Sequence, residues 1–488
     1  MSSRRQFLLA GAVGVGGIAG AGCSEPRSAR SGQPTTTDRA TVDRAAAARS
    51  RVIVLGAGLA GLVAATDLRA RGWDVTVLEA RERVGGRVLT IREPFTGGQV
   101  AEAGPEFIDD SHARLLARVA ALGLRTQRRP AAGSRDDTVS FRGQVRTESE
   151  LPSSVARGFL LWQNALDEIA DGIDPEAPDT AARAEELDSR SAASLLDSLG
   201  LDDLARFVIA GVTGSEYACD LEQLSLLFLA QQEVLPTGGE SEAMRVEGGN
   251  DQVPKLLAQA LGGAIVTGAP VTQVKWTADT VEVSSGAMTV HGRHLVVAIP
   301  PPALRNIAFS PALPTAVASW VHDMELGAAT KTITQYSERF WRRAGPSGWG
   351  ESLADLDYRV SWDATDTTDT PGGILTAFTT AQYGEALGRL DDATRIARVQ
   401  QQVEGVLGGA PRLRGATFTR VWQQEKFTGG GYAHFRPGQM VPWWKPLRDP
   451  VGPIRFAGEH TEALAGYMES AVRSGERIAV AIGVAPHR

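Results

Sequence analysis

Residues 51–61 of this 488-residue chain, RVIVLGAGLAG, decide the fold. The apolar run before Gly56 is typical of a buried parallel strand, and the apolar residues after Gly58 recur at helical spacing. The glycines therefore fall on a turn from strand to helix. Gly56 permits the tight turn, Gly58 lets the backbone approach a pyrophosphate, and Gly61 lets the helix pack close to its strand. Because a helix N-terminus favours negative charge, the stretch predicts a dinucleotide site.

A second apolar strand, residues 75–79 with the sequence VTVLE, follows the predicted helix. Its last residue, Glu79, stands where a carboxylate can accept hydrogen bonds from a ribose hydroxyl. The next segment, ARERVGGR at 80–87, adds paired glycines that allow close backbone approach and arginines that match phosphate. Strand, turn, helix, strand and acid in this order favour a ligand site over a packing turn.

These motifs resemble the flavin-containing amine oxidase family, as do two later stretches, IRFAGEHT at 454–461 and GYMESAVRSG at 466–475. The resemblance covers about residues 50–488 and is densest at the two ends. It implies that FAD lies along these motifs, with a helix near Met468 pointing its N-terminus at the flavin ring. The implied cofactor-binding residues are Gly56, Gly58, Leu59, Ala60, Gly61, Glu79, Ala80, Arg81, Gly86, Arg87, Gly104, Pro105, Glu106, Phe107, Val271, Gly458, Glu459, Met468 and Glu469.

The resemblance also implies an α/β fold in two intergrown parts. We expect a Rossmann-like FAD-binding domain from residues 49–110, 248–314 and 453–488, and a mixed α+β substrate domain from 111–247 and 315–452. Helical periodicity predicts a helical block over 111–247, and short strands are expected at 264–266, 271–274, 295–300, 331–336 and 373–379. Ligand would bind between the two domains, where clefts normally form.

Three catalytic residues follow from the resemblance. Lys331 falls where the family has a lysine that holds a water against flavin N5; the alternative is an exposed strand lysine. Tyr432 and Tyr467 match two tyrosines that face each other across the flavin in monoamine oxidases. Such a pair attracts an amine through cation–π interaction and disfavours its charged form by desolvation, so both tyrosines are also expected to bind substrate.

Departures from the family pattern narrow the prediction. Gly431 stands where animal monoamine oxidases carry the cysteine bound to the flavin, so FAD is expected without a covalent bond. Phe107 stands where L-amino-acid oxidases supply an arginine for the substrate carboxylate, which favours amines over amino acids. Asp109 lies near a carboxylate that pairs with the distal ammonium in some polyamine oxidases, so with Glu106 it would favour a diamine; a solvated loop is the alternative.

The predicted function is therefore FAD-dependent oxidative deamination of a primary or secondary amine, with O2 as the second substrate and an imine or aldehyde and hydrogen peroxide as products. Three alternatives stay open: an L-amino-acid oxidase, a flavin dehydrogenase or desaturase with another electron acceptor, and a flavin-binding protein without turnover.

The first 48 residues have a different character. Residues 3–9, SRRQFLL, and the Gly/Ala-rich run to Gly22 have the form of a twin-arginine signal peptide, which predicts passage through the twin-arginine translocase and an extracytoplasmic location. Cys23 partly fits a lipoprotein box, which leaves open a lipid anchor or a plain cleaved signal. Residues 23–48 are expected to form a disordered tether.

The composition argues against several other classes of protein. A net charge of −7 over this length provides no basic surface for nucleic acid. Only Cys219 remains after processing, and no Cys/His cluster has metal-ligand spacing, so neither an internal disulfide nor a metal is expected. No run after Arg27 approaches the length of a membrane-spanning helix. A homodimer is left open.

Overall fold

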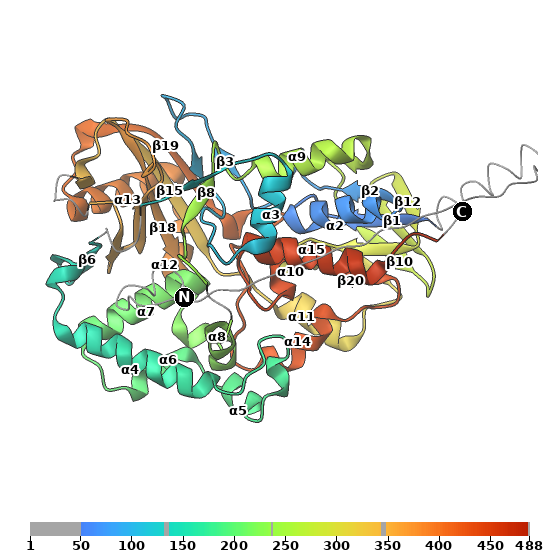
Figure 1. The fold of residues 1–488 in the computed structure, drawn as a ribbon, viewed down its shortest axis with the longest axis horizontal. Helices are drawn as coiled ribbons and strands as arrows, with labels where there is room; N and C mark the ends of the chain where they lie inside the picture. The colour runs from blue at the N-terminus through green and yellow to red at the C-terminus, as the bar shows by residue number, and fades with distance from the viewer. Residues whose placement is uncertain (1–49, 131–135, 236–237, 343–347, 487–488) are drawn as a thin grey trace, which may run out of the picture.

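The computed structural model describes residues 50–130, 136–235, 238–342 and 348–486. The predicted signal peptide, the Cys23 anchor and the whole tether predicted at 23–48 lie outside these residues. In Figure 1 the two main sheets stand side by side, with the parallel sheet around β1 on the right and the larger sheet around β15 on the left. A group of helices that includes α4 and α7 lies below the larger sheet.

The parallel sheet begins with the strand predicted from RVIVL. Val52 and Val54 face one hydrophobic core and Ile53 and Leu55 face another, so the strand is buried on both faces. This burial explains its continuous apolar sequence. The strand order is β20 (Ile454–Phe456), β13 (His294–Val297), β1 (Arg51–Leu55), β2 (Asp74–Leu78) and β9 (Ile265–Val266). The α/β fold is therefore confirmed, and this sheet draws its strands from 49–110, 248–314 and 453–488.

Two helices pack closely beside this sheet. Helix α2 (Leu59–Ala70) follows β1, and α15 (Met468–Ile482) follows β20. The two helices meet at Gly475, where a Cβ would lie 2.6 Å from the carbonyl oxygen of Ala60. The first and last motifs of the sequence are therefore neighbours in space, as Figure 1 shows for α2 and α15.

A second, four-stranded sheet extends the same part of the molecule. Its order is β12 (Met288–Gly292), β11 (Val281–Ser285), β10 (Gln273–Trp276) and β14 (Ala308–Ser310). Nearby, α9 (Gln252–Leu261) packs on α2.

The seven-stranded sheet forms the floor of the other half. Its order is β19 (Arg414–Val421), β15 (Ala329–Tyr336), β18 (Gly373–Thr380), β17 (Val360–Asp363), β16 (Ser352–Ala354), β6 (Thr138–Phe141) and β7 (Gln144–Thr147). The strands expected at 331–336 and 373–379 are thus two neighbouring antiparallel strands of this sheet, β15 and β18. Helices α12 (Ala381–Gly388) and α13 (Asp392–Leu407) pack against it.

The predicted helical block is only partly correct. Between 153 and 233 the chain is helical, with α4 (Ser153–Ala170), α5 (Ala184–Asp188), α6 (Ala192–Ser198), α7 (Asp203–Tyr217) and α8 (Leu226–Glu233). The prediction is wrong for β5 (Thr126–Arg128), β6, β7 and β8 (Met244–Val246). Arg142 and Gly143, both at positive φ, close the β6–β7 hairpin. A two-residue turn ending in glycine between alternating residues was the signal for it.

No helix among the described residues is long and apolar enough to cross a membrane. Within the same part of the chain, no group of three or more histidine, cysteine and acidic side chains could hold a metal ion.

Candidate active site

A cavity of about 640 Å³ lies between the parallel sheet and the seven-stranded sheet. One wall comes from the ends of β1 and β2, and the other comes from β15 and β18. Its volume is in the range of cofactor and ligand sites. The two sheets come from segments that alternate along the sequence, so the cavity joins residues far apart in the chain.

The three glycines of the first motif have different surroundings. Gly56 has φ +97°, and a Cβ there would lie 2.7 Å from the Ala298 carbonyl oxygen. A Cβ on Gly61 would lie 2.0 Å from the Gly56 carbonyl oxygen, so close packing of α2 requires glycine. A Cβ on Gly58 would meet no atom within 4 Å, and Gly58 lines the cavity. Because no side chain caps α2 there, its N-terminal N–H groups are available to a pyrophosphate.

Glu79 and the paired glycines lie against this turn. The Glu79 carboxylate lines the cavity and accepts hydrogen bonds from the backbone N–H groups of Ala57, at 2.8 Å, and Arg81, at 2.9 Å. The Gly85 N–H donates to the Ala57 carbonyl, and a Cβ on Gly86 would lie 3.3 Å from the Gly58 Cα. The two N-terminal motifs therefore build one continuous backbone surface.

Arg87 connects three distant segments at the cavity. Its Nη1 donates to the Gly431 carbonyl at 2.6 Å and to Glu459 Oε1 at 2.7 Å. Burial alone would raise the pKa of Glu459, but the Arg87 charge and the hydrogen bonds from Arg87 and the Gly466 N–H act together with the neighbouring His460 to lower it. The resemblance implies that Arg87 lies near the flavin or its phosphates, and here its side-chain partner is Glu459 of the C-terminal motif.

Most of the predicted cofactor residues come together on the cavity wall. The wall contains Gly56, Gly58, Leu59, Ala60, Glu79, Ala80, Arg81, Gly86, Arg87, Gly104, Pro105, Glu106, Phe107, Val271, Gly458, Glu459 and Met468. Gly61 and Glu469 lie outside it. Gly61 packs α2, and the Glu469 carboxylate accepts the backbone N–H groups of Arg114 and Leu115 at the start of α3 (Ala113–Ala121).

Lys331 is buried in the cavity wall, with only 7% of its side chain exposed. Its Nζ donates to the carbonyls of Glu102, at 3.0 Å, and Gly104, at 2.9 Å, and lies 3.3 Å from Glu106 Oε2. It also stands 5.0 Å from the centre of the Trp362 ring. Burial lowers the pKa of Lys331, and the charge of Glu106 opposes that shift. The exposed strand lysine considered as the alternative is not what the structure shows.

Tyr432 and Tyr467 line the same cavity from separate loops. The Tyr432 hydroxyl donates to the Ser215 carbonyl at 2.8 Å, which fixes its ring beside Gly466. The Tyr467 ring packs edge-on against His112, with 5.2 Å between ring centres. The structure thus brings together two aromatic rings that lie 35 residues apart in sequence.

Three carboxylates surround the tyrosine side of the cavity. Asp109, Glu216 and Glu242 all line it. Burial is the largest cause that raises the pKa of Tyr467, and the charges of these three carboxylates raise it further. Burial, with Glu242 and Glu216 nearby, raises the pKa of Asp109 to about 7, although the Glu242 N–H donates to its carboxylate. Asp109 thus lies on the wall and not in a solvated loop. Glu216 and Glu242 belong to no motif, and neither was predicted from the sequence as a site residue.

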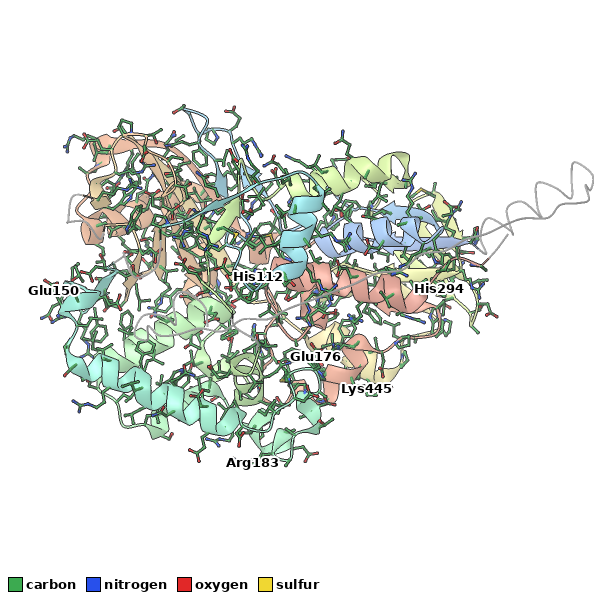
Figure 2. The ribbon with its side chains drawn as sticks, viewed as in Figure 1. His112, Glu150, Glu176, Arg183, His294 and Lys445 are labelled. Carbon is green, nitrogen blue, oxygen red and sulfur yellow. The ribbon has the colours of Figure 1, made fainter. Side chains whose placement is uncertain are left out.

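A second cavity of about 920 Å³ adjoins this side. Asp109, Glu216, Tyr217 and Tyr467 line both cavities and form the wall between them. His112, near the middle of the molecule in Figure 2, also lines the second cavity. Burial lowers the pKa of His112 to about 4, so the ring is neutral at pH 7. The shared wall is therefore acidic and aromatic.

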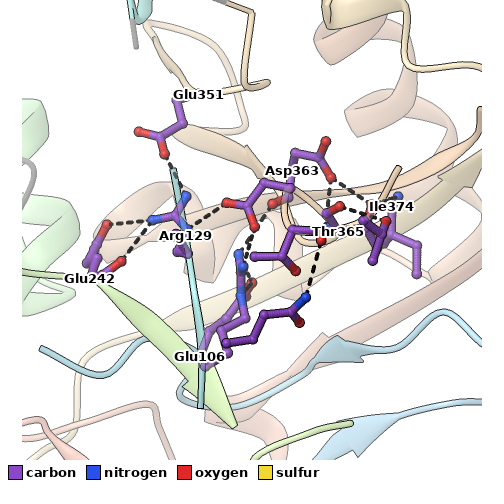
Figure 3. A network of polar contacts seen from close by, with 12 residues as sticks. Glu106, Arg129, Glu242, Glu351, Asp363, Thr365 and Ile374 are labelled. Atoms are coloured by element: carbon purple, nitrogen blue, oxygen red, sulfur yellow. Dashed lines mark hydrogen bonds and ion pairs between the residues drawn. The ribbon is translucent and has the colours of Figure 1, made fainter. Parts of the chain in front are cut away.

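The two arginines near Phe107 form ion pairs with carboxylates. The guanidinium groups of Arg129 and Arg245 lie 4.3 and 4.9 Å from the Phe107 ring centre. Each forms ion pairs with Asp366, at 2.6 and 2.5 Å, and Figure 3 shows the network around Arg129. The described cavity wall contains two arginines, Arg81 and Arg87, which bind Thr428 and Glu459.

The parallel sheet, the glycine turns and the acid after β2 define a dinucleotide-binding protein. The family model for flavin-containing amine oxidoreductases matches residues 59–483. A flavin-containing amine oxidase of Oncorhynchus mykiss is 30% identical over 450 residues, which cover 88% of this chain and 84% of that protein.

Solved structures agree with the sequence comparison. Cyclohexylamine oxidase from Brevibacterium oxydans has a TM-score of 0.80 and 28% identity, over 89% of this chain and 98% of that one. A putrescine oxidase bound to putrescine has a TM-score of 0.79 and 26% identity, again over 89% and 98% of the two chains.

The chain belongs to the flavin-containing amine oxidoreductase family. It is an FAD-dependent amine oxidoreductase, and the open space at Gly58 and the Glu79 carboxylate fit the cofactor. The described cavity wall contains glycine at position 431 and no cysteine, in agreement with FAD held without a covalent bond. Cys219 lies buried in the core, and burial raises its pKa.

Proposed function

We propose that the enzyme catalyses oxidative deamination of a primary or secondary amine. The glycine turn at residues 56–61 and Glu79 would hold FAD, which would supply at its N5 the acceptor for a hydride from the carbon beside the nitrogen. With O2 as the final electron acceptor, the products would be hydrogen peroxide and an imine, which water hydrolyses to an aldehyde. The protein residues bind the amine, orient it and control its charge.

The observation that carries this proposal is the polarity of the cavity beside the tyrosines. Asp109, Glu216 and Glu242 bring negative charge to the place where the substrate's functional group would lie. A cationic amine is attracted there, whereas an amino acid would bring its carboxylate toward three acidic groups. Arg129 and Arg245, the guanidinium groups that could have replaced the missing arginine at Phe107, are already paired.

Each residue then has a separate task. The rings of Tyr432 and Tyr467 attract the ammonium, and their apolar faces favour the neutral amine that can lose a hydride. Lys331, buried in the cavity wall, would hold a water beside bound FAD. Asp109 binds a second ammonium when the substrate is a diamine.

The test is anaerobic mixing of the purified holoenzyme with tryptamine, tryptophan and putrescine, following loss of the oxidised flavin absorption band. We expect the amines to reduce the flavin and tryptophan to leave it oxidised. Faster reduction by tryptophan would identify an L-amino-acid oxidase. Reduction by no amine would contradict the proposal, and reduction without peroxide formation in air would point to another electron acceptor.

We further propose that the folded protein leaves the cytoplasm by the twin-arginine route. The SRRQFLL stretch supports this proposal, and export of a folded protein suits a cofactor loaded before export. Changing Arg4 and Arg5 together to lysine should leave the holoenzyme in the cytoplasm of a host that has this translocase. Cys23→Ala tests the anchor, because only an acylated protein would move from the membrane fraction to the soluble fraction.

A further inference from the structure

A chain of buried ion pairs leads away from Lys331, behind the cavity wall. Glu106 is shared by two cations: its Oε2 lies 3.3 Å from Lys331 Nζ, and its Oε1 lies 3.1 and 3.0 Å from Nε and Nη2 of Arg245. The Glu106 side chain is 2% exposed. In this setting the two cations compete for one carboxylate with little screening by water.

The far side of Arg245 forms a further ion pair, and Figure 3 shows part of this network around Glu106 and Arg129. Arg245 Nη1 lies 2.5 Å from Asp366 Oδ1, and Asp366 Oδ2 lies 2.6 Å from Arg129 Nε. Arg129 in turn pairs with Glu351 at 2.8 Å. Burial alone would raise the pKa of Asp366, but Arg245 and Arg129 lower it to about 2. The network therefore remains charged at neutral pH and fixes Arg245 against Glu106.

The other charged groups around Lys331 are weaker partners. Glu102 contributes its backbone carbonyl to Lys331, and burial raises the pKa of its carboxyl to about 7, so the carboxyl is only partly ionised at neutral pH. On the neighbouring strand β19, Arg420 stands opposite Lys331 and pairs with Glu425. From β17 and β18, the rings of Trp362 and Phe378 face the ammonium. Glu106 is therefore the main counter-ion of Lys331.

We propose that Glu106 and Arg245 are opposed positioning residues for Lys331: Glu106 keeps the ammonium charged at the flavin cavity, and Arg245 limits that effect by holding the same carboxylate. The proposal rests on the proposed role of Lys331 beside the flavin. Removing Glu106 leaves Lys331 buried and facing the Arg245 cation, so Lys331 should lose its proton at lower pH. Removing Arg245 leaves the whole carboxylate charge to Lys331, so Lys331 should hold its proton to higher pH.

The experiment compares Glu106→Gln and Arg245→Gln in the FAD-loaded enzyme. The readouts are the visible spectrum and the midpoint potential of the bound flavin as functions of pH, because a nearby ammonium stabilises the anionic reduced ring. In these pH profiles, the step that is absent from the Lys331→Met variant is the titration of Lys331. We expect Glu106→Gln to move this step down by about one pH unit or more and Arg245→Gln to move it up.

Glu351→Gln is the matched control, because it removes the same charge from the same network and Glu351 does not contact Lys331. In this variant the Lys331 titration step should stay at the wild-type pH. Glu106→Asp, which keeps the charge, should shift less than Glu106→Gln and serves if Arg245→Gln does not fold. If the wild-type step lies above the accessible pH, Glu106→Gln should bring it into range.

Three results overturn the proposal while amines still reduce the flavin. The Lys331 titration step could move in the same direction in Glu106→Gln and Arg245→Gln, or stay at the wild-type pH in both. The pH profiles of the wild type and of Glu106→Gln could also both lack a step. Failure of every amine to reduce the wild-type flavin would instead contradict the proposed function, because the spectrum and potential are measured without an amine.

Discussion

The two ends of the cavity are built in different ways. At the nucleotide end, glycines and backbone N–H groups from the continuous stretches 51–61 and 79–87 form the surface. At the reaction end, side chains from β15, β17, β18, α7 and several loops meet around Lys331 and Tyr467. A surface of backbone requires specific residues at fixed spacing, whereas an arrangement of side chains can be assembled from many positions. The nucleotide end can therefore be recognised in the sequence as a motif, and the reaction end cannot.

The largest effect is expected where a glycine is required by packing. In Gly61→Ala the new Cβ would lie 2.0 Å from the Gly56 carbonyl oxygen, and backbone on both sides cannot move away. We expect the apo-protein to lose about 3 kcal/mol of unfolding free energy, measured by denaturant titration. Gly405→Ala in α13 is the control, because its Cβ meets nothing within 4 Å; alanine there should stabilise the helix by up to about 1 kcal/mol. Equal stability of both variants would contradict the packing role.

A smaller effect, confined to the cofactor, is expected at Gly58. Its φ of −73° suits alanine and its Cβ would enter open space, so the stability of the apo-protein should not change. The methyl group would occupy the place where a pyrophosphate approaches the helix. We expect the dissociation constant of FAD to rise about 100-fold, or ~2.7 kcal/mol, in a fluorescence titration. Unchanged FAD affinity would show that the phosphates bind elsewhere.

At the reaction end, Tyr467→Ala should affect the substrate more than the cofactor. Loss of one ring removes cation–π attraction and lets water reach the amine, which should lower kcat/KM about tenfold (~1.4 kcal/mol). Tyr467→Phe keeps the ring that packs on His112 and should retain most of the activity. If FAD retention falls further than turnover, Tyr467 has a structural role at the start of α15.

The smallest effect concerns Asp109 and the length of the substrate. With a pKa of about 7, Asp109 becomes ionised as the pH rises from 6 to 8, so its attraction for a second ammonium grows over that range. The ratio of kcat/KM for putrescine to that for butylamine should therefore rise about fivefold (~1 kcal/mol) over that range. Because both substrates carry a reacting amine, taking the ratio cancels most of the effect that protonation of that amine has on kcat/KM.

Asp109→Asn should remove this pH dependence and keep the hydrogen bond from the Glu242 N–H. The adjacent Asp110→Asn is the control, because Asp110 lines neither described cavity and pairs with Arg128. A ratio that is independent of pH in the wild type would exclude Asp109 as a diamine site.

The local elements of the fold were largely predictable. The β1–α2–β2 unit and the return of β13 to the parallel sheet follow from periodicity and from the family pattern. The β6–β7 hairpin was not found, because short strands with exposed residues have weak hydrophobic periodicity. The helical block expected from residue 111 begins with α3 at Ala113, and a difference of two residues is typical at a helix boundary.

Glycine spacing and strand periodicity are local properties of a chain, so the amino-acid order was enough to predict the parallel sheet, the nucleotide end of the cavity and the family. Folding was needed to show that Glu106 is shared by Lys331 and Arg245, and that Glu216 and Glu242 join Asp109 beside the tyrosines. These contacts join segments more than 100 residues apart, and the charge of a buried group depends on which other groups the fold brings near it.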